Sequence, residues 1–434
     1  MLCEARVWRS LLKRAPRSAS NQTSTSSKPI FRNPHKASIS CSYSTLPSNS
    51  GETPLSALHP LPEESEWKRV FSPPASPLIL RERISIRNPK TARALAEGFT
   101  NWTKPFLKAD EAMGRGRAAK GAPKILIEAF PGPGALTRAL LTLPRDTFDR
   151  LLVLENHPAY LDYLKPLEQI DDRVKVIPYS GYSWDTYSML EEQGWLDDVP
   201  KIPWDDGVHP SLHFISHVPL SVVGEQLMNQ FLRCIPDKAW LFKYGRVPLN
   251  LITGEWVWKR SSAGPMESAR CKLSVIADAT AELSLTLPQE RLLPYVEHFH
   301  PLVHTAGKPS KKPVGRKVGH PMVGVSILPH EDQAIGVAML EKWDYCLRRL
   351  FVLKGQSLKV AIGSLAPGAQ SLLKPLTDPS LPPEQRLDMN KQIRRLDIRD
   401  WALIIRAFNN WPFAPEDLLI HDTYNPGSRG GMHE

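Results

Sequence analysis

Two glycines, Gly132 and Gly134, and one carboxylate, Glu155, are residue types found in nucleotide-binding sites, and their spacing in the chain is the one such sites use. The segment 130–134, Phe-Pro-Gly-Pro-Gly, follows the short apolar run 125–129 and precedes leucines that recur at helical intervals. Strand, glycine-rich turn and helix open a nucleotide-type βαβ unit, in which amides at a helix N-terminus face the ligand. Glu155 ends a second apolar run about twenty residues later, where such folds place an acid for ribose hydroxyls. Together these features predict a nucleotide site, whereas the glycines alone would favour a plain strand-to-helix turn.

The segments that must position these residues alternate between strand and helix patterns. This alternation predicts a mostly parallel α/β sheet of seven strands with antiparallel edge strands. After Glu331 helical spacing dominates and no convincing strand occurs, which predicts a separate small helical domain. The candidate strands, one more than the seven of the predicted sheet, are 125–129, 150–155, 174–179, 212–217, 239–244, a strand with helix-like neighbours in 270–276, 281–287 and 322–328. The expected C-terminal helical segments are 334–353, 356–365 and 383–410.

The first fifty residues differ from the rest of the chain in charge. They hold eight Lys or Arg and the single acid Glu4, so seven of the ten net positive charges lie there. Apolar residues interleave with these cations as in a basic amphipathic helix, which is typical of a mitochondrial transit peptide; the alternative is a disordered basic tail. The predicted organisation is a transit peptide 1–50, an extended Pro-rich lead-in 51–82, an α/β domain 83–329, a helical domain 330–420 and a flexible tail 421–434.

Composition narrows the class of protein. A chain of 434 residues with 41% hydrophobic and 23% charged residues can bury a substantial core. The five cysteines show no CxxC spacing, so we expect reduced thiols and no metal site. No apolar run reaches the roughly 18 residues that span a bilayer, so we expect no membrane insertion.

Two clusters of cations have the composition of phosphate-binding surfaces. The first lies on a Pro- and Gly-containing loop without acids, and a solvated loop is an equally good interpretation. The second lies in the C-terminal region, where helical spacing would place Arg395 and Arg399 on one face. We predict nucleic-acid binding by Lys308, Lys311, Lys312, Arg316 and Lys317 in the first cluster, and by Lys391, Arg394, Arg395 and Arg399 in the second.

Four motifs in order resemble one known family. GPGALT with Glu128 ahead of it, VLEN around Glu155, SHVPL at 216–220 and the Arg-rich helical C-terminus are similar to the rRNA adenine N6-dimethyltransferases, over about residues 84–419. The resemblance implies a seven-stranded Rossmann-like S-adenosylmethionine methyltransferase fold with a small C-terminal helical domain. It also implies a pocket for S-adenosylmethionine at Ile86, Phe130, Gly132, Gly134, Glu155, Gly181 and His217.

Three parts of the expected pocket depart from the pattern of that family. Phe130 stands where its glycine turn has the first glycine, and Gly181 stands where an acid would bind the adenine of the cofactor. The methyl-transfer motif, normally Asn-Leu-Pro-Tyr, is here His217-Val218-Pro219-Leu220, and leucine cannot stack on a flipped adenine as an aromatic ring does. We therefore expect a vestigial pocket, no catalytic residue in this degenerate motif, and no required cofactor.

The stretches SGYSWDTY at 180–187 and RAFNNWPFAP at 406–415 resemble a fungal mitochondrial branch of the family. That branch implies a transcription initiation factor of the mitochondrial matrix, with promoter DNA and the mitochondrial RNA polymerase as partners. Two alternatives remain open. One is an active mitochondrial rRNA adenine N6-dimethyltransferase that uses S-adenosylmethionine, and the other is a non-catalytic rRNA-binding factor in ribosome assembly.

Overall fold

The computed structural model describes residues 58–71, 83–100, 122–220, 222–302 and 318–418. All of them lie within one compact unit, Ser50–Glu434. The predicted transit peptide, the tail 421–434, most of the lead-in and the basic loop 308–317 lie outside the described residues, and those predictions stand untested. In the described part of the chain, no helix has both the length and the apolar character needed to cross a membrane.

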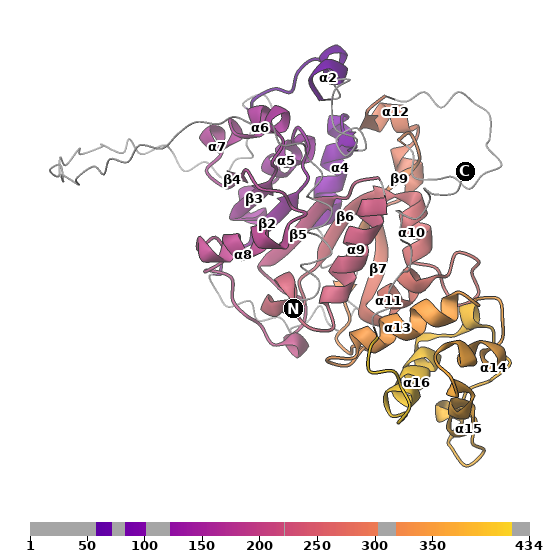
Figure 1. The fold of residues 1–434 in the computed structure, drawn as a ribbon. Helices are drawn as coiled ribbons and strands as arrows, with labels where there is room; N and C mark the ends of the chain where they lie inside the picture. The colour runs from indigo at the N-terminus through magenta and orange to yellow at the C-terminus, as the bar shows by residue number, and fades with distance from the viewer. Residues whose placement is uncertain (1–57, 72–82, 101–121, 221, 303–317, 419–434) are drawn as a thin grey trace, which may run out of the picture. The chain divides into compact units, whose positions relative to one another are not determined.

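A sheet of seven strands forms the centre of the structure, in the order β4-β3-β2-β5-β6-β9-β7 (Figure 1). The first five in this order are parallel, and β9 runs antiparallel to both β6 and β7. The predicted methyltransferase-type sheet is confirmed, although its antiparallel strand lies inside the sheet rather than at the edge. The strands are β2 Ile125–Ala129, β3 Arg150–Leu154, β4 Val174–Ile177, β5 Leu212–His217, β6 Leu249–Gly254, β7 Ala281–Leu287 and β9 Met322–Pro329.

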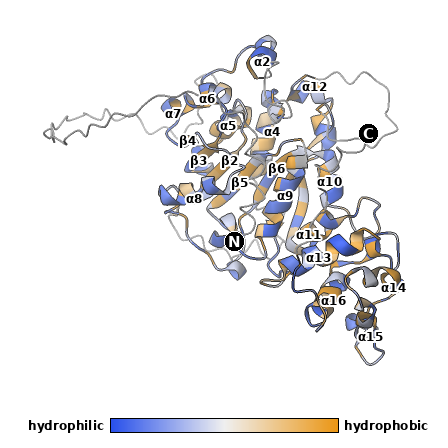
Figure 2. Cartoon of the chain, viewed as in Figure 1, coloured by the Kyte–Doolittle hydropathy of each residue, from blue (hydrophilic) through white to orange (hydrophobic). Residues whose placement is uncertain are grey.

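Alternation along the strands sends side chains to two hydrophobic clusters. On β2, Ile125 and Ile127 belong to one cluster and Leu126 to the other, so helices cover both faces. The helices carry apolar and polar residues together (Figure 2), as expected when one face of each is buried. They are α2 Glu64–Phe71, α4 Pro89–Thr100, α5 Ala135–Leu141, α6 Pro158–Leu164, α7 Leu167–Ile170, α8 Trp184–Glu192, α9 Val222–Cys234, α10 Glu255–Ser261, α11 Lys272–Thr280 and α12 Tyr295–His298.

The C-terminal region is helical, as predicted, and shares its core with the sheet. Trp343, Leu347 and Trp401 are buried in the same cluster as the β2 residues Ile125 and Ile127. A capping box of Asp397 and Asp400 begins the last helix. The elements are α13 Leu340–Phe351, α14 Leu358–Ala361, α15 Leu373–Leu376 and α16 Ile398–Asn409. The domain boundary near residue 330 therefore stays a prediction.

Three predicted elements are wrong. Trp240–Tyr244 is a 3₁₀ helix, and the strand beside β5 is Leu249–Gly254, whose pattern is interrupted by Asn250. The segment 270–276 forms the beginning of α11 rather than a strand. The expected helix 383–410 is continuous only from Ile398, because the segment before it forms two separate 3₁₀ turns, Pro383–Gln385 and Ile393–Arg395, and extended backbone at Leu396 and Asp397 separates the second turn from the helix.

A short two-stranded ladder lies outside the main sheet. Strand β1, Ser85–Ile86, pairs antiparallel with β8, Phe299–His300. Its residues are buried: Ser85 is 2% exposed and Ile86 is 3% exposed. The ladder joins two segments that are more than 200 residues apart in the chain, so it fixes the N-terminal segment against the rest of the domain.

Asn250 interrupts the apolar pattern of β6 because it joins several elements through buried hydrogen bonds. Its amide nitrogen donates to Nε2 of His213 on β5 and, at 3.3 Å, to the carbonyl oxygen of Phe99 on α4. Its amide oxygen accepts from the hydroxyl of Ser326 on β9. A fully buried amide is stable only when such partners are present.

Replacing this residue should therefore destabilise the sheet. We expect Asn250→Ala to lower the free energy of unfolding by about 3 kcal/mol, because three buried groups each lose one hydrogen bond. Urea unfolding measures the change. The same exchange at exposed Asn390 is the control and should stay within about 0.5 kcal/mol of the parent; equal stability of the two variants would contradict the role of the buried network.

Candidate functional site

The predicted pocket residues meet at the carboxyl ends of three neighbouring strands. Phe130 follows β2, Glu155 follows β3, and His217 is the last residue of β5. The register pairs Ala129 with Leu154 and with Ser216, so the three residues lie side by side. The chain order of the strands reverses between β2 and β5, which is the usual ligand-binding position in open parallel sheets.

The glycine turn has the backbone geometry that its sequence predicts. Gly132 and Gly134 have φ angles of 60° and 86°, in the left-handed region that favours glycine. A Cβ atom on Gly132 would lie 2.7 Å from Oγ of Ser85, and one on Gly134 would lie 2.4 Å from Cδ2 of Leu164. The turn is therefore packed against neighbouring segments of the chain itself.

Phe130 replaces the first glycine of the turn and keeps its backbone conformation. Its φ angle is 60°, which costs a phenylalanine on the order of 1 to 3 kcal/mol. The side chain is 6% exposed, and its ring centroid lies 4.5 Å from that of Tyr182. A Cβ atom on Gly181 would lie 3.4 Å from the Phe130 ring and 2.8 Å from Cβ of Ala129. A side chain at position 181 would therefore have to displace Ala129, and it would start in contact with this ring.

Glu155 is held by an arginine of the same chain. Nη1 of Arg83 donates to Oε1 at 2.9 Å, and Nη2 donates to Oε2 at 2.6 Å. The backbone amides of Asn156 and His157 also donate to Oε1, at 3.0 and 2.9 Å. The Glu155 and Arg83 side chains are 1% and 9% exposed. Burial alone would lower the pKa of Arg83, but the attraction and hydrogen bonds of Glu155 outweigh it and raise that pKa.

Sequence reasoning did not find Arg83. It lies 72 residues before Glu155, and no local pattern connects the two positions. Its guanidinium carbon lies 4.7 Å from the centroid of the Tyr160 ring and 5.6 Å from that of Phe130. The only usable signal was the position of this arginine directly before the apolar strand residues Ile84 and Ile86.

The degenerate motif at 217–220 is buried in the core. Val218 and Leu220 are 1% and 2% exposed. A Cβ atom on Gly224 would lie 1.9 Å from the carbonyl oxygen of Pro219, so α9 packs directly on this loop. Leu220 also lies against Gly254 at the end of β6. None of these side chains offers an open surface on which a base could stack.

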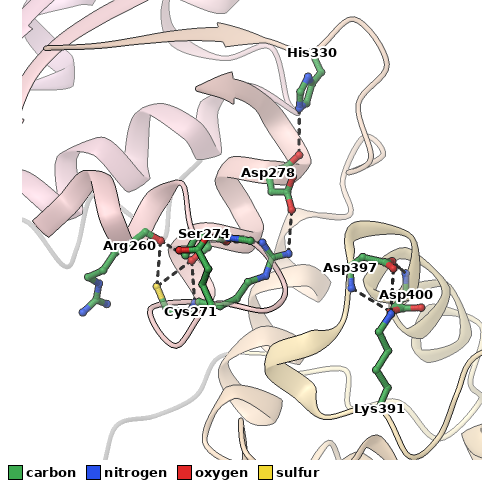
Figure 3. Close-up of polar contacts among 12 residues, drawn as sticks. Arg260, Cys271, Ser274, Asp278, His330, Lys391, Asp397 and Asp400 are labelled. Carbon is green, nitrogen blue, oxygen red and sulfur yellow. Dashed lines mark hydrogen bonds and ion pairs between the residues drawn. The ribbon is translucent and has the colours of Figure 1, made fainter. Parts of the chain in front are cut away.

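Two of the four predicted C-terminal cations are held by acids or by backbone carbonyls. Nζ of Lys391 forms ion pairs with Asp397, at 3.1 Å, and with Asp400 (Figure 3). Arg399 donates to the carbonyl oxygens of Glu384 and Pro383 at 2.5 and 2.7 Å. The predicted helical face is wrong, because Arg395 ends a 3₁₀ turn and Arg399 belongs to α16.

A different arrangement brings cations together in this region. The segments 354–359 and 389–394 run antiparallel: the Arg394 amide donates to the Lys354 carbonyl at 3.1 Å, and the Lys359 amide donates to the Met389 carbonyl at 2.9 Å. Apart from Lys391, whose ion pairs are described above, exposed or half-buried cations lie along these segments or directly after them, and the structure shows none of these other cations in an ion pair with another described residue. We call this surface the basic ribbon; it consists of Lys354, Lys359, Arg394 and Arg395.

Residues 123–409 match the family model described as ribosomal RNA adenine dimethylase. The chain belongs to this family. Curated relatives include mitochondrial transcription factor 1 of Lachancea kluyveri, 23% identical over 67% of this chain and 82% of that protein. The protein of the same name from Saccharomyces paradoxus is 25% identical over 57% and 69% of the two chains. Mitochondrial dimethyladenosine transferase 1 of Caenorhabditis elegans is 26% identical over 36% and 41%.

Among solved structures, a dimethyladenosine transferase from Plasmodium falciparum covers 75% of this chain and 97% of its own, at 14% identity and a TM-score of 0.45. The expected resemblance to the dimethylase family and to its mitochondrial transcription factors is confirmed by the family model and the curated relatives.

The residues at the pocket do not fit S-adenosylmethionine as the dimethylase family binds it. Both oxygens of Glu155, which would hold the ribose, already accept hydrogen bonds from Arg83. The Phe130 ring fills space that a glycine would leave open, and position 181 has no carboxylate for the adenine. Among the described residues no group of His, Cys, Asp and Glu is arranged to hold a metal ion.

His217 gives the pocket a measurable pH dependence. Burial, and then the charge of Arg83, lower its pKa to about 3. The unfolded chain binds a proton at this histidine below about pH 6.5, whereas the folded protein does not. His217 therefore contributes no pH dependence above that value and lowers stability progressively as the pH falls from about 6.5 towards 3.

We expect His217→Asn to reduce the slope of unfolding free energy against pH by up to about 1.4 kcal/mol per pH unit between pH 6 and 4.5. Urea unfolding at a series of pH values measures this slope. Val218→Ala is the control: it removes buried apolar atoms beside His217 and should lower stability equally at every pH. An unchanged slope in His217→Asn would show that this histidine is protonated in the folded state.

Proposed function

We propose that this protein is a mitochondrial transcription initiation factor that binds promoter DNA and helps the mitochondrial RNA polymerase recognise and melt promoters. The observation that carries the proposal is that the protein's own side chains fill the pocket. Arg83 donates hydrogen bonds to both oxygens of Glu155, the carboxylate that a methyltransferase of this family would use to bind its cofactor. The similarity to mitochondrial transcription factor 1 of two yeasts supports it. We also propose that the protein acts in the mitochondrial matrix and requires no cofactor.

Melting requires a protein that favours separated strands over duplex DNA. Unpairing and unstacking a base costs a few kcal/mol, and binding to phosphates and exposed bases offsets that cost. The basic ribbon carries the positive charge needed to bind phosphates. Phosphate contacts position a protein on DNA but do not recognise the base sequence. The loop 308–317, predicted from its five cations, would add a second such surface.

Two other functions are compatible with the dimethylase family. An active mitochondrial rRNA adenine N6-dimethyltransferase is favoured by the relatives named dimethyladenosine transferase, and it requires S-adenosylmethionine to bind. A non-catalytic rRNA-binding assembly factor would share the filled pocket and the cations. Calorimetry with S-adenosylmethionine distinguishes the first of these from our proposal, and promoter-dependent transcription distinguishes the second.

The proposal is tested on promoter DNA that carries 2-aminopurine near the start site. We expect the polymerase with this protein to raise the fluorescence of 2-aminopurine and to produce transcript on linear duplex, and the polymerase alone to do neither. A promoter with an unpaired start region should relieve the requirement for the protein. The initiation-factor proposal fails if the polymerase alone gives the same fluorescence and transcript, and persistence of the defect on unpaired DNA would assign the protein to recruitment instead of melting.

The basic ribbon makes a separate prediction about affinity. Changing Lys354, Lys359, Arg394 and Arg395 to Ala should weaken duplex binding and reduce the slope of log affinity against log salt by up to about 0.9 for each phosphate that the protein no longer neutralises. Fluorescence anisotropy over a range of salt concentrations measures the slope. The matched control removes four cations that are paired with carboxylates, namely Arg69, Arg145, Lys243 and Lys259. If the two variants give equal slopes, the loss of net charge alone explains the weaker binding, and the basic ribbon does not contact DNA.

A further inference from the structure

The buried Glu155 carboxylate needs a cation. A carboxylate with 1% side-chain exposure has lost nearly all of its water, and in such a place a charge is stable only when paired and hydrogen-bonded. Arg83 meets this need with two parallel hydrogen bonds, the geometry in which a guanidinium matches a carboxylate best. Two backbone amides complete the set of donors around Glu155.

The surroundings select a guanidinium rather than an ammonium. A planar cation can lie against aromatic rings, and here Tyr160 and Phe130 both lie within the range of cation–π attraction of the Arg83 guanidinium carbon, at 4.7 and 5.6 Å. Phe130 therefore does more than block the glycine position, since its ring forms one side of the place where the guanidinium lies. The charge also reaches the end of β5, where it helps to lower the pKa of His217.

The arginine is attached to a segment that cannot move away freely. Directly after it, Ser85 pairs with His300 and Ile86 pairs with Phe299 in the β1–β8 ladder. Ile84 and Ile86 are 5% and 3% exposed. Ser85 lies against the glycine turn, where a Cβ atom on Gly132 would lie 2.7 Å from its Oγ. Arg83 is thus held in the pocket by the chain on its C-terminal side.

We propose that the pocket at the carboxyl ends of β2, β3 and β5 is a guanidinium site whose permanent occupant is Arg83 of the same chain. The guanidinium takes the hydrogen bonds that Glu155 would otherwise offer to a diffusible ligand, and the ion pair fixes the segment Arg83–Ile86 across the pocket. Glu155, the residue that most strongly indicates a nucleotide site in the sequence, thereby stabilises the fold. This inference concerns the ion pair itself and holds whether or not the protein acts in transcription.

Chemical rescue tests the proposal on the full chain. Arg83→Ala leaves Glu155 buried without its cation, and we expect the melting temperature to fall by about 5 °C or more. Guanidinium or methylguanidinium at low millimolar concentration should bind the vacated site and raise the melting temperature of this variant, since a ligand that binds only the folded state stabilises it. Sodium chloride at equal ionic strength should not, and the parent protein should gain nothing from either salt.

Two further variants make the outcome decisive. Arg69→Ala, which breaks the exposed Arg69–Glu66 pair, is the matched control and should show neither the fall nor the rescue. Arg83→Ala combined with Glu155→Gln should lose the rescue, because the neutral amide no longer attracts the cation. The proposal is overturned if Arg83→Ala is as stable as the parent, or if guanidinium raises no melting temperature above the sodium chloride value.

If Arg83→Ala does not yield folded protein, the pair Arg83→Met with Glu155→Gln replaces it. The amide oxygen of Gln can still accept from the amides of Asn156 and His157, so removing both charges should recover folded protein that Arg83→Met alone does not give. Equal loss of folding in the single and double variants would show that Arg83 contributes through packing alone, which would also overturn the proposed ionic role.

Discussion

The burial of the Glu155 carboxylate is the constraint on which the rest of the pocket depends. Because the acid that follows β3 is only 2% exposed, some group must neutralise its charge or supply its hydrogen bonds. In this protein Arg83, 72 residues earlier in the chain, neutralises the carboxylate and donates hydrogen bonds to it. Phe130 and Tyr160 then lie against the cation, and β1 lies where Arg83 can reach the acid. One electrostatic requirement therefore connects residues from four separate segments of the chain.

The parallel sheet explains why these residues meet at all. Helices cover both faces, so the side chains that remain available for function lie at the carboxyl ends of the strands. The sequence predicts this convergence well, because strands 125–129 and 212–217 have the expected bounds and Glu155 follows β3 directly. Apolar runs bounded by breakers reveal buried strands, and the end of such a strand reveals which residue faces the pocket.

Long-range pairing is what the sequence could not reveal. Nothing local connects Arg83 with Glu155, and β6 escaped detection because Asn250, a partner of His213 and Ser326, disturbs its apolar run. The C-terminal cations show the same limit. Helical spacing predicted a shared face for Arg395 and Arg399, but extended backbone at Leu396 and Asp397 separates the two residues. Backbone pairing of 354–359 with 389–394 instead brings cations of two distant segments together. The spacing of residues within one strand or helix could be predicted from the sequence, whereas the contacts between separate elements could be found only in the structure.

The glycine turn has a structural role in this protein. Arg138, buried beside the turn, donates to the carbonyls of Pro133 and Gly134 at 2.7 and 2.9 Å and to that of Tyr163 at 2.7 Å. Gly134 packs against Leu164, so any side chain there would push α6 away. These interactions give the glycines a structural role that is independent of any cofactor, because replacing either one would strain the backbone and the packing at once. In this protein the turn therefore gives little information about chemistry, whereas the atoms that surround Glu155 give much more.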